Sequence, residues 1–216
     1  IHLRDGKKLG DAQITDTMIK DGLWDAFNGY HMGVTAENVA TKFQVTRDDQ
    51  DKFALESQKK AFQAQKDNKF KEEIINFKIK SKKTETVFNK DEHPREGVNL
   101  EALRRLKPVF KKDGTVTAGN ASGINDGAAA LTLMSSEEAE KREMQKLVSI
   151  KSWTSCGVDP ALMGTGPIPS SKRALDLAGW SINDVDLFEI NEAFAAQSIA
   201  VIRTLSIPEE KVNVNG

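Results

Sequence analysis

Asn191 opens the sequence NEAFAAQ and follows the hexapeptide VDLFEI at residues 185–190, in which four of the six residues are apolar. We expect residues 185–190 to form a buried strand and residues 193–205 to form a helix. Asn191 and Glu192 then lie at the carboxyl end of a parallel strand, where open α/β sheets bind their ligands. An amide at that point can hold a water molecule or donate into an oxyanion site. The alternative is that Asn191 only caps the helix.

Small residues dominate a second segment, DGTVTAGNASGINDG at residues 113–127. Eight of the ten residues from Ala118 to Gly127 are Gly, Ala, Ser or Asn. Side chains this small let one backbone approach another, or let a ligand approach the backbone. The segment is therefore either a tight crossing inside the core or one wall of a binding site.

Three further features give weaker signals. The tetrapeptide GTGP at residues 164–167 partly resembles a dinucleotide fingerprint, but its proline and the missing third glycine argue against one. Cys156 is the single cysteine, which excludes an internal disulfide and a cysteine-based metal site. Without a nearby His in sequence, we expect it to be an inert packing residue. The three histidines, His2, His31 and His93, have spacings that do not predict a metal site.

The overall composition restricts the class of protein. The chain has 216 residues, with 31 basic and 32 acidic side chains and a net charge of −1. This balance argues against a nucleic-acid-binding protein and against a basic membrane-surface module. No apolar run approaches the length of a membrane span. The single cysteine fits a reducing compartment, so the cytoplasm is the expected location.

The elements that must position these residues follow from periodicity. Residues 13–70 have helical spacing, with Thr35 as one expected helix cap and Thr46 with Asp49 as a capping box. Residues 74–88 alternate between apolar and polar side chains, which predicts half-buried strands. Residues 100–106 are expected to form a short helix.

The second half of the chain alternates strand and helix patterns. Strands are expected at residues 128–134, 147–153 and 185–190, separated by a helix capped at Ser135 and by a helix that ends at Gly179. Such alternation predicts an α/β architecture with a mainly parallel sheet. Short extended flanks around Asp5-Gly6 predict a hairpin in residues 1–12.

Five sequence blocks resemble the thiolase family, and more narrowly its biosynthetic members, which form acetoacetyl-CoA. The resemblance runs in the family's order over nearly the whole chain. The blocks are YHMGVTAENVA (30–40), NASGINDGAA (120–129), MGTGPIP (163–169), NEAFAAQ (191–197) and KVNVNG (211–216).

The resemblance implies a partial thiolase-like α/β fold, in which two βαβαβαββ halves stack around shared helices. Residues 1–12 then form a tetramerisation hairpin, and residues 13–112 form a loop domain that covers coenzyme A. Residues 113–146 end the N-terminal half, and residues 147–216 begin the C-terminal half. A homotetramer, built as a dimer of dimers, follows from the same resemblance.

The resemblance also implies a reaction. Two acetyl-CoA molecules condense to acetoacetyl-CoA and CoA through an acetyl-cysteine intermediate, and the reaction is reversible. Asn191 would act through a water in one oxyanion hole. The family's two cysteines and its GHP histidine fall outside these 216 residues, so we expect the chain alone to be inactive. A degradative 3-ketoacyl-CoA thiolase and a non-catalytic coenzyme A-binding fragment are the alternatives.

The substrate-binding residues also follow from the resemblance. No tightly bound cofactor is expected, because the coenzyme A thioester is itself the substrate. The enzyme is expected in the cytoplasm, or in the mitochondrion of a eukaryote. The acyl end is expected to contain His31, Met32 and Met163. The pantetheine tunnel is expected to be lined by Phe110, Ala118, Ser122, Ala193 and Phe194. The nucleotide end is expected to contain Arg95.

Overall fold

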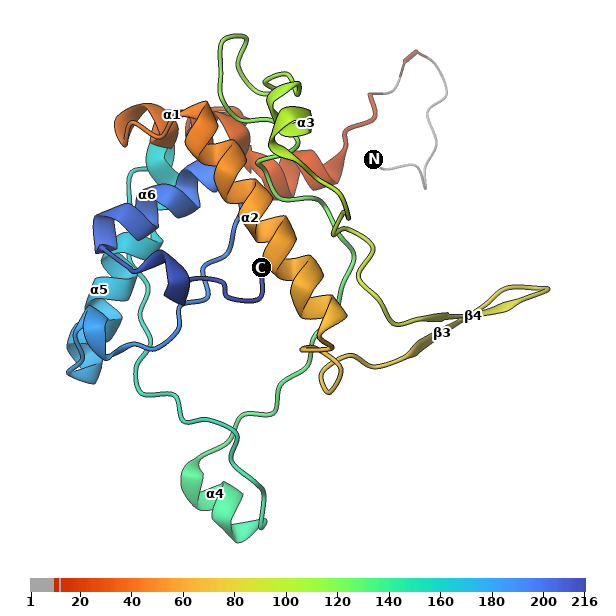
Figure 1. Cartoon of the computed structure of the whole chain (residues 1–216), viewed down its shortest axis with the longest axis vertical. Helices are drawn as coiled ribbons and strands as arrows, with labels where there is room; N and C mark the ends of the chain where they lie inside the picture. Colours follow the sequence, from red (N-terminus) through yellow and green to blue (C-terminus); the bar gives the residue numbers. More distant parts are fainter. Residues whose placement is uncertain (1–9, 12) are drawn as a thin grey trace.

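Three helices form the centre of the molecule (Figure 1). The computed structural model describes residues 10, 11 and 13–216. Helix α6 (Ala195–Leu205) packs against both α1 (Met32–Lys42) and α2 (Arg47–Lys66). Apolar side chains between them form two buried clusters, whose members are Val39, Val45, Ile199 and Ala200 in one and Val201, Ile202, Leu205, Ile207 and Val212 in the other.

Shorter elements surround this centre. The remaining elements are a π-helix (Met18–Leu23), β1 (Trp24–Asp25), β2 (Tyr30–His31), β3 (Phe77–Lys80), β4 (Glu85–Phe88), α3 (Leu100–Arg104), α4 (Ser136–Lys141), α5 (Pro167–Ala178) and 3₁₀ helices at Pro160–Thr165, Ile182–Asp184 and Glu209–Lys211. The 3₁₀ helix at Pro160–Thr165 packs on α1 and α6. Among the described residues, no helix is long and apolar enough to cross a membrane.

Local capping signals account for several helix ends. The capping box of Thr46 and Asp49 is confirmed: the Asp49 amide donates to the Thr46 hydroxyl, and the Thr46 amide donates to the Asp49 carboxylate. The predicted stop after α5 is also confirmed, because Gly179 has a left-handed φ of 71°. Ser135 caps α4 as expected, by accepting a hydrogen bond from the Glu138 amide.

The predicted cap at Thr35 is wrong. Helix α1 begins three residues earlier, at Met32, and the ring nitrogen Nδ1 of His31 accepts a hydrogen bond from the Gly33 amide at 2.9 Å. Thr35 is buried inside the first turn, where its hydroxyl donates to the Met32 carbonyl. An imidazole nitrogen can satisfy a free amide at a helix N-terminus as a hydroxyl does.

The alternating segment 74–88 forms an antiparallel hairpin, in which Phe77 pairs with Phe88 and Lys80 with Glu85. The hairpin projects from the rest of the molecule (Figure 1). All residues of β3 and β4 are exposed, so the prediction of half-buried strands is wrong. Alternation predicts which side chains share a face, but it does not show that another element covers that face.

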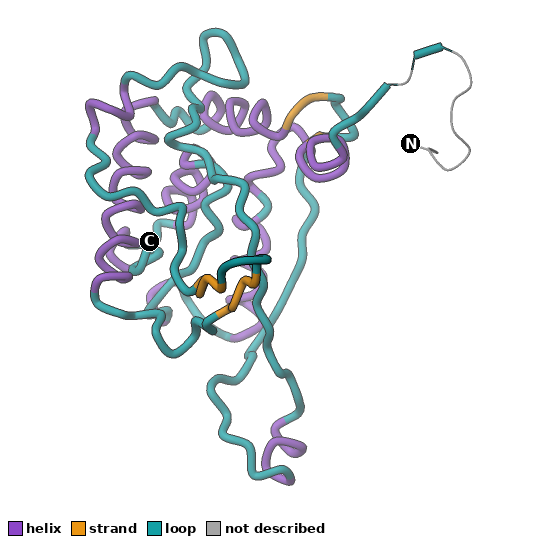
Figure 2. The backbone as a smooth tube through the Cα atoms, turned by 90° about the vertical axis from the view of Figure 1, so that its right-hand side faces the viewer, coloured by secondary structure: helices purple, strands orange, loops and turns teal. Residues whose placement is uncertain are grey.

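The predicted strands at residues 128–134 and 147–153 are absent from the described part of the chain. Both segments are irregular, and Leu131 and Val148 are 88% and 85% exposed. A strand requires a neighbour for its backbone hydrogen bonds, and no described segment pairs with either one. Figure 2 shows these stretches as loops on the way to and from α4.

The predicted strand at residues 185–190 is reduced to a single parallel bridge between Phe188 and Val212. Both two-stranded sheets of the described chain are antiparallel, so the expected parallel sheet does not form within it. The Asp5-Gly6 turn of the expected N-terminal hairpin lies outside the described residues.

Candidate functional site

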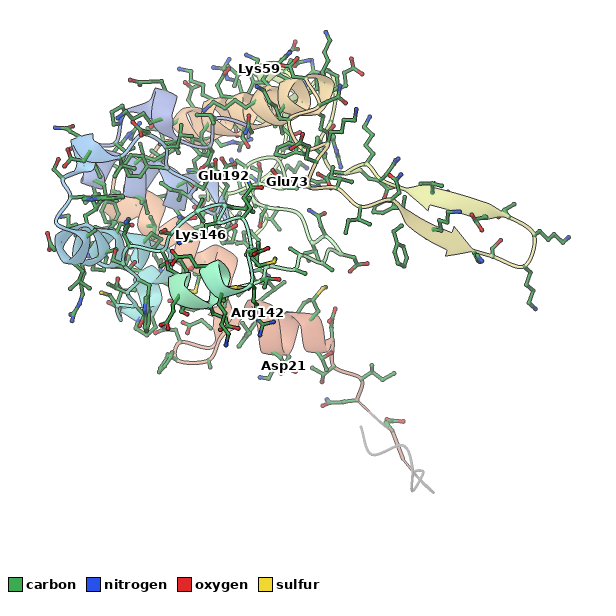
Figure 3. The ribbon with its side chains drawn as sticks, turned by 90° about the horizontal axis from the view of Figure 1, so that it is seen from below. Asp21, Lys59, Glu73, Arg142, Lys146 and Glu192 are labelled. Atoms are coloured by element: carbon green, nitrogen blue, oxygen red, sulfur yellow. The ribbon has the colours of Figure 1, made fainter. Side chains whose placement is uncertain are left out.

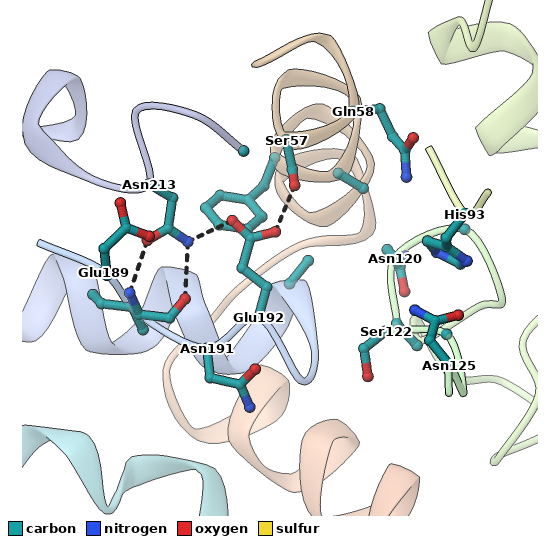
Figure 4. Close-up of a pocket in the computed structure, with 18 residues that line it drawn as sticks. Ser57, Gln58, His93, Asn120, Ser122, Asn125, Glu189, Asn191, Glu192 and Asn213 are labelled. Carbon is teal, nitrogen blue, oxygen red and sulfur yellow. Dashed lines mark hydrogen bonds between the residues drawn. The ribbon is translucent and has the colours of Figure 1, made fainter. Parts of the chain in front are cut away.

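A cavity of about 510 Å³ lies between α2, the small-residue segment and the chain before α6 (Figure 4). Its walls are mostly polar, and they include two of the predicted site residues, Ser122 and Asn191. The residues on α2 that face it include Phe53, Ser57 and Gln58, and His93 lies at its edge beside Gly123. The cavity therefore joins three segments that are far apart in the sequence.

A buried carboxylate on α1 holds the small-residue segment in place. Glu37, only 4% exposed, accepts hydrogen bonds from the amides of Thr115 and Val116, each at 2.8 Å to Oε1. Its Oε2 also accepts from the Thr115 hydroxyl at 3.0 Å. A Cβ on Gly114 would overlap the Glu37 carboxylate, so the glycine allows this close approach.

A second buried carboxylate, on α2, fixes the same segment further along. Asp51 has no exposed surface and accepts from Arg47 Nε at 2.8 Å and from Asn120 Nδ2 at 3.0 Å. Asn120 also accepts through Oδ1 from the Thr117 amide at 2.8 Å. Its backbone carbonyl accepts from the Ala195 amide in the first turn of α6. The wall of the cavity is thus rigidly tied to all three central helices.

Backbone contacts place the segment 120–123 directly beside the chain before α6. The Ser122 amide donates to the Ala193 carbonyl at 3.0 Å, and Ala121 forms an antiparallel bridge with Phe194. Two small residues therefore lie against another backbone. The structure supports the tight crossing and also places the crossing in the wall of the cavity.

Asn191 is exposed on the cavity wall and does not cap α6. The helix begins at Ala195 and its N-cap residue is Phe194, which forms no side-chain cap. The capping alternative for Asn191 is therefore wrong. Within the part of the chain that the structure describes, no hydrogen bond engages the Asn191 side chain, so its amide is free to bind a ligand or a water.

An aromatic cluster brings three other predicted residues together. The ring of His31 stacks on Phe110, with centroids 4.6 Å apart, and Phe110 meets the ring of Phe194 edge to face at 6.1 Å. Burial lowers the pKa of His31 below its ordinary value of 6.5. The shift favours the neutral form of the imidazole. Because Nδ1 accepts from the Gly33 amide, the ring proton resides on Nε2.

The other predicted residues do not line this cavity. Met32 is the first residue of α1, and Met163 is 38% exposed on the 3₁₀ helix that packs against α1. Arg95 is exposed, and its amide donates to Gln58 Oε1 at 2.9 Å at the cavity edge. Ala118 is exposed on the small-residue segment. Their binding roles stay predictions.

Sequence reasoning missed the polar residues that link the walls of the cavity. Glu192 accepts from the Ser57 hydroxyl at 2.6 Å and from Asn213 Nδ2 at 2.6 Å. Glu192 is partly buried, whereas Figure 3 shows Lys59 on the outer side of α2. The sequence around Glu192 does not indicate that its carboxylate is bound by Ser57 and Asn213. The one available signal in the sequence was Ser57, a polar residue at helical spacing from Phe53, Ala61 and Ala64.

The described residues contain no group of three or more His, Cys, Asp or Glu side chains that could hold a metal ion. The buried carboxylates Glu37 and Asp51 use their oxygens on amides and on a guanidinium. Cys156 is a free, partly buried thiol outside the cavity. The polar groups that line the cavity are amides and hydroxyls together with the carboxylates of Glu189 and Glu192 and the imidazole of His93, all of which can hydrogen-bond a ligand.

Comparison with known proteins identifies the family. Residues 1–137 match the thiolase N-terminal domain, and residues 144–216 match the thiolase C-terminal domain. The chain belongs to the thiolase family. It is 57% identical over 215 residues to an acetyl-CoA acetyltransferase of Paracoccus denitrificans, and 53% identical over 217 residues to the cytosolic acetyl-CoA acetyltransferase of Rattus norvegicus. Both alignments cover 100% of this chain and 55% of the relative, so the chain spans about half the length of these relatives.

Solved structures give the same result for the fold. The chain superimposes on the Bacillus anthracis acetyl-CoA acetyltransferase with a TM-score of 0.94 and 47% identity, covering 99% of this chain and 54% of the other. It superimposes on human mitochondrial 3-ketoacyl-CoA thiolase with a TM-score of 0.89 and 40% identity, covering 100% and 54%. The expected partial thiolase-like α/β fold is therefore confirmed, although several of its expected strands do not form within the described chain.

Proposed function

We propose that the protein carrying this chain is a thiolase-type acyltransferase that condenses two acetyl-CoA molecules to acetoacetyl-CoA and CoA, and that also catalyses the reverse thiolysis. The observation that carries this proposal is the free amide of Asn191 on the wall of the cavity. The relatives with 53–57% identity over the whole chain are named acetyl-CoA acetyltransferases, which supports the same substrate class.

The proposed reaction uses groups outside these 216 residues for its covalent steps. A cysteine thiolate attacks the first acetyl-CoA, and CoA leaves as the thiolate. A second cysteine removes a proton from the methyl group of the second acetyl-CoA. The resulting carbanion attacks the acetyl-cysteine, and the thiolate of the first cysteine leaves. Asn191 holds a water that donates to the thioester oxygen while negative charge develops on it.

We expect the other predicted site residues of this chain, inside and outside the cavity, to bind and orient the substrate. Small side chains at Ala118 and Ser122 leave room for a thin pantetheine arm to pass close to the backbone. The Nδ1 of His31 accepts from the Gly33 amide, so we expect its Nε2–H to be the donor that faces the acyl end of the substrate. Arg95 is at the cavity edge, where a guanidinium can pair with a phosphate of the nucleotide.

A degradative 3-ketoacyl-CoA thiolase is the second candidate function. The TM-score of 0.89 with human mitochondrial 3-ketoacyl-CoA thiolase favours keeping it. The two candidates differ in acyl chain length. Thiolysis of C4 and C8 3-ketoacyl-CoA by the full-length protein tests them. A strong preference for C4 supports the biosynthetic proposal, and equal rates with C8 would reject it.

Assembly is part of the same proposal. We expect a homotetramer in which residues 1–12 of the subunits pair with one another, and a location in the cytoplasm or mitochondrion. Deletion of residues 7–10 from the full-length protein should then give dimers. Light scattering measures the mass of the assembly directly, and an unchanged tetramer would contradict the role of this segment.

A further inference from the structure

The side chain of Asn213 takes the place of a neighbouring strand beside Ile190. The backbone of Asn213 donates to the Phe188 carbonyl at 2.9 Å, next to the parallel bridge of Phe188 and Val212. Its side-chain Oδ1 then accepts from the Ile190 amide, and its Nδ2 donates to the Ile190 carbonyl, each at 2.8 Å. One amide side chain thus satisfies both backbone polar groups of the residue that precedes Asn191.

The second N–H of Asn213 Nδ2 donates a hydrogen bond to Glu192, the residue that follows Asn191. The distance from Asn213 Nδ2 to Glu192 Oε1 is 2.6 Å, and Glu192 Oε2 accepts from the Ser57 hydroxyl on α2, also at 2.6 Å. These charge-assisted bonds are short and strong. Asn213 is 5% exposed, so water competes poorly for them. Both neighbours of Asn191 are therefore held, and one of them is anchored to a central helix.

Asn191 and Glu192 are consecutive residues, and their side chains point in different directions. Figure 4 shows Glu192 directed toward Ser57 and Asn213, and Asn191 directed away from them. We propose that Asn213 and Glu192 are positioning residues that hold Asn191 in its orientation in the cavity. The proposal rests on the catalytic role proposed for Asn191.

The backbone conformation of Asn213 determines which substitution tests the positioning role without adding strain. Its φ is +43°, a left-handed conformation that asparagine and glycine tolerate better than other residues. Asn213→Gly removes the side-chain clamp without straining the backbone. Asn68→Gly is the matched control, because Asn68 has a φ of +56°, is exposed and lies outside the cavity.

The first measurement is hydrogen exchange of the Ile190 amide in the full-length protein. Asn213→Gly should accelerate it, because the acceptor Oδ1 is gone, while Asn68→Gly should leave it unchanged. Equal exchange in wild type and Asn213→Gly would overturn the clamp. This readout does not depend on activity. If the wild-type protein turns over no acyl-CoA, the proposed function fails and faster exchange still supports the clamp.

The second measurement is a double-mutant cycle in kcat. If Asn213 acts through Asn191, Asn213→Gly should lower kcat by about ten- to a hundredfold with little change in KM. Adding it to Asn191→Ala should then cost nothing further. Losses that multiply in the double variant, or a wild-type kcat in Asn213→Gly, would overturn the positioning role.

Substitutions of Glu192 keep the test valid if Asn213→Gly fails to fold. Glu192→Gln can still accept from Asn213 and can donate to Ser57, whose hydroxyl both donates and accepts. Glu192→Ala loses both contacts. We expect Glu192→Gln to retain most of the kcat that Glu192→Ala loses. Equal losses in the two variants would show that the charge of Glu192 matters rather than its hydrogen bonds, and would overturn the proposal.

Discussion

The imidazole of His31 and the ring of Phe110 stack at a centroid distance of 4.6 Å and an angle of 23° between planes. Gly33 makes this arrangement possible, because a Cβ at that position would overlap the Phe110 ring. The stack joins the N-terminus of α1 to the segment after α3. His31 is thereby held by two independent contacts, the ring stack and the bond from the Gly33 amide to its Nδ1.

The stack predicts the effect of Gly33→Ala. The new methyl group must displace Phe110, so the ring of His31 loses its partner and the edge contact of Phe110 with Phe194 is also disturbed. We expect destabilisation by about 1–3 kcal/mol, as for other overpacked sites. Chemical denaturation measures it. Gly157→Ala is the control, since nothing lies within 4 Å of a Cβ there.

The lowered pKa of His31 predicts a pH dependence of stability. Burial disfavours the charged imidazole in the folded state, so the unfolded chain binds the proton more tightly. The contribution of His31 to stability is then complete above the unfolded pKa of about 6.5 and falls as the pH decreases through the lower, folded pKa. Protonation also removes the acceptor for the Gly33 amide.

Thermal unfolding at pH 7.5 and pH 5.5 checks this pH dependence. The decrease in Tm between the two should be smaller in His31→Asn, which does not titrate there and can still accept from the amide of the first turn. An equal decrease in wild type and His31→Asn would contradict a role for His31. His93→Asn is the matched control, because His93 is exposed at the cavity edge.

The hydrogen bonds of the Glu37 carboxylate predict that the nearly isosteric substitution Glu37→Gln strongly lowers the free energy of unfolding. Oε1 accepts from the amides of Thr115 and Val116, and Oε2 accepts from the amide and the hydroxyl of Thr115. Glu37→Gln therefore turns one acceptor into a donor that faces a backbone donor. We expect a loss of about 1–3 kcal/mol in the free energy of unfolding. Urea denaturation measures it. Glu101→Gln, at an exposed ion pair with Arg105, should cost far less.

Local signals were the part of the fold that the sequence predicted best. The Thr46–Asp49 capping box and the stop at Gly179 each depend on residues within one helical turn, so a short stretch of sequence is enough to predict them. Strands at residues 128–134 and 147–153 were wrong for the opposite reason. A strand depends on a partner, and Leu131 and Val148 have none among the described residues.

The same contrast holds for the site. Asn191 was found from its position after an expected strand, and both Asn191 and Ser122 belong to sequence blocks that resemble a family. Glu37 and Asp51 were missed, because a carboxylate on a helix usually faces water. Their function depends on Thr115 and Asn120, which are more than sixty residues away in sequence. Spacing along one helix cannot reveal a partner at that distance.

The size of the Met32 side chain leads to a prediction about the acyl chain length that the protein accepts. We expect its side chain, with that of Met163, to crowd the acyl end, so wild-type protein should prefer C4 over C8 3-ketoacyl-CoA. Met32→Ala removes part of that bulk and should raise kcat/KM for C8 relative to C4. A Met144→Ala control, at an exposed side chain beyond α4, should leave the ratio unchanged. An unchanged ratio in Met32→Ala would contradict the assignment.

Asn191 gives the sharpest test of the proposed chemistry, because the structure has removed its structural alternative. It is exposed and caps no helix, so Asn191→Ala should change the free energy of unfolding by less than about 0.5 kcal/mol. If its amide holds the oxyanion water, the same substitution should lower kcat by about a hundredfold or more with little change in KM. Asn191→Asp keeps the size of the side chain but places a carboxylate beside the developing negative charge. We expect it to fold normally and to turn over poorly. Steady-state kinetics and chemical denaturation on the same samples separate the two effects, and a near-normal kcat in Asn191→Asp would exclude Asn191 from the chemistry.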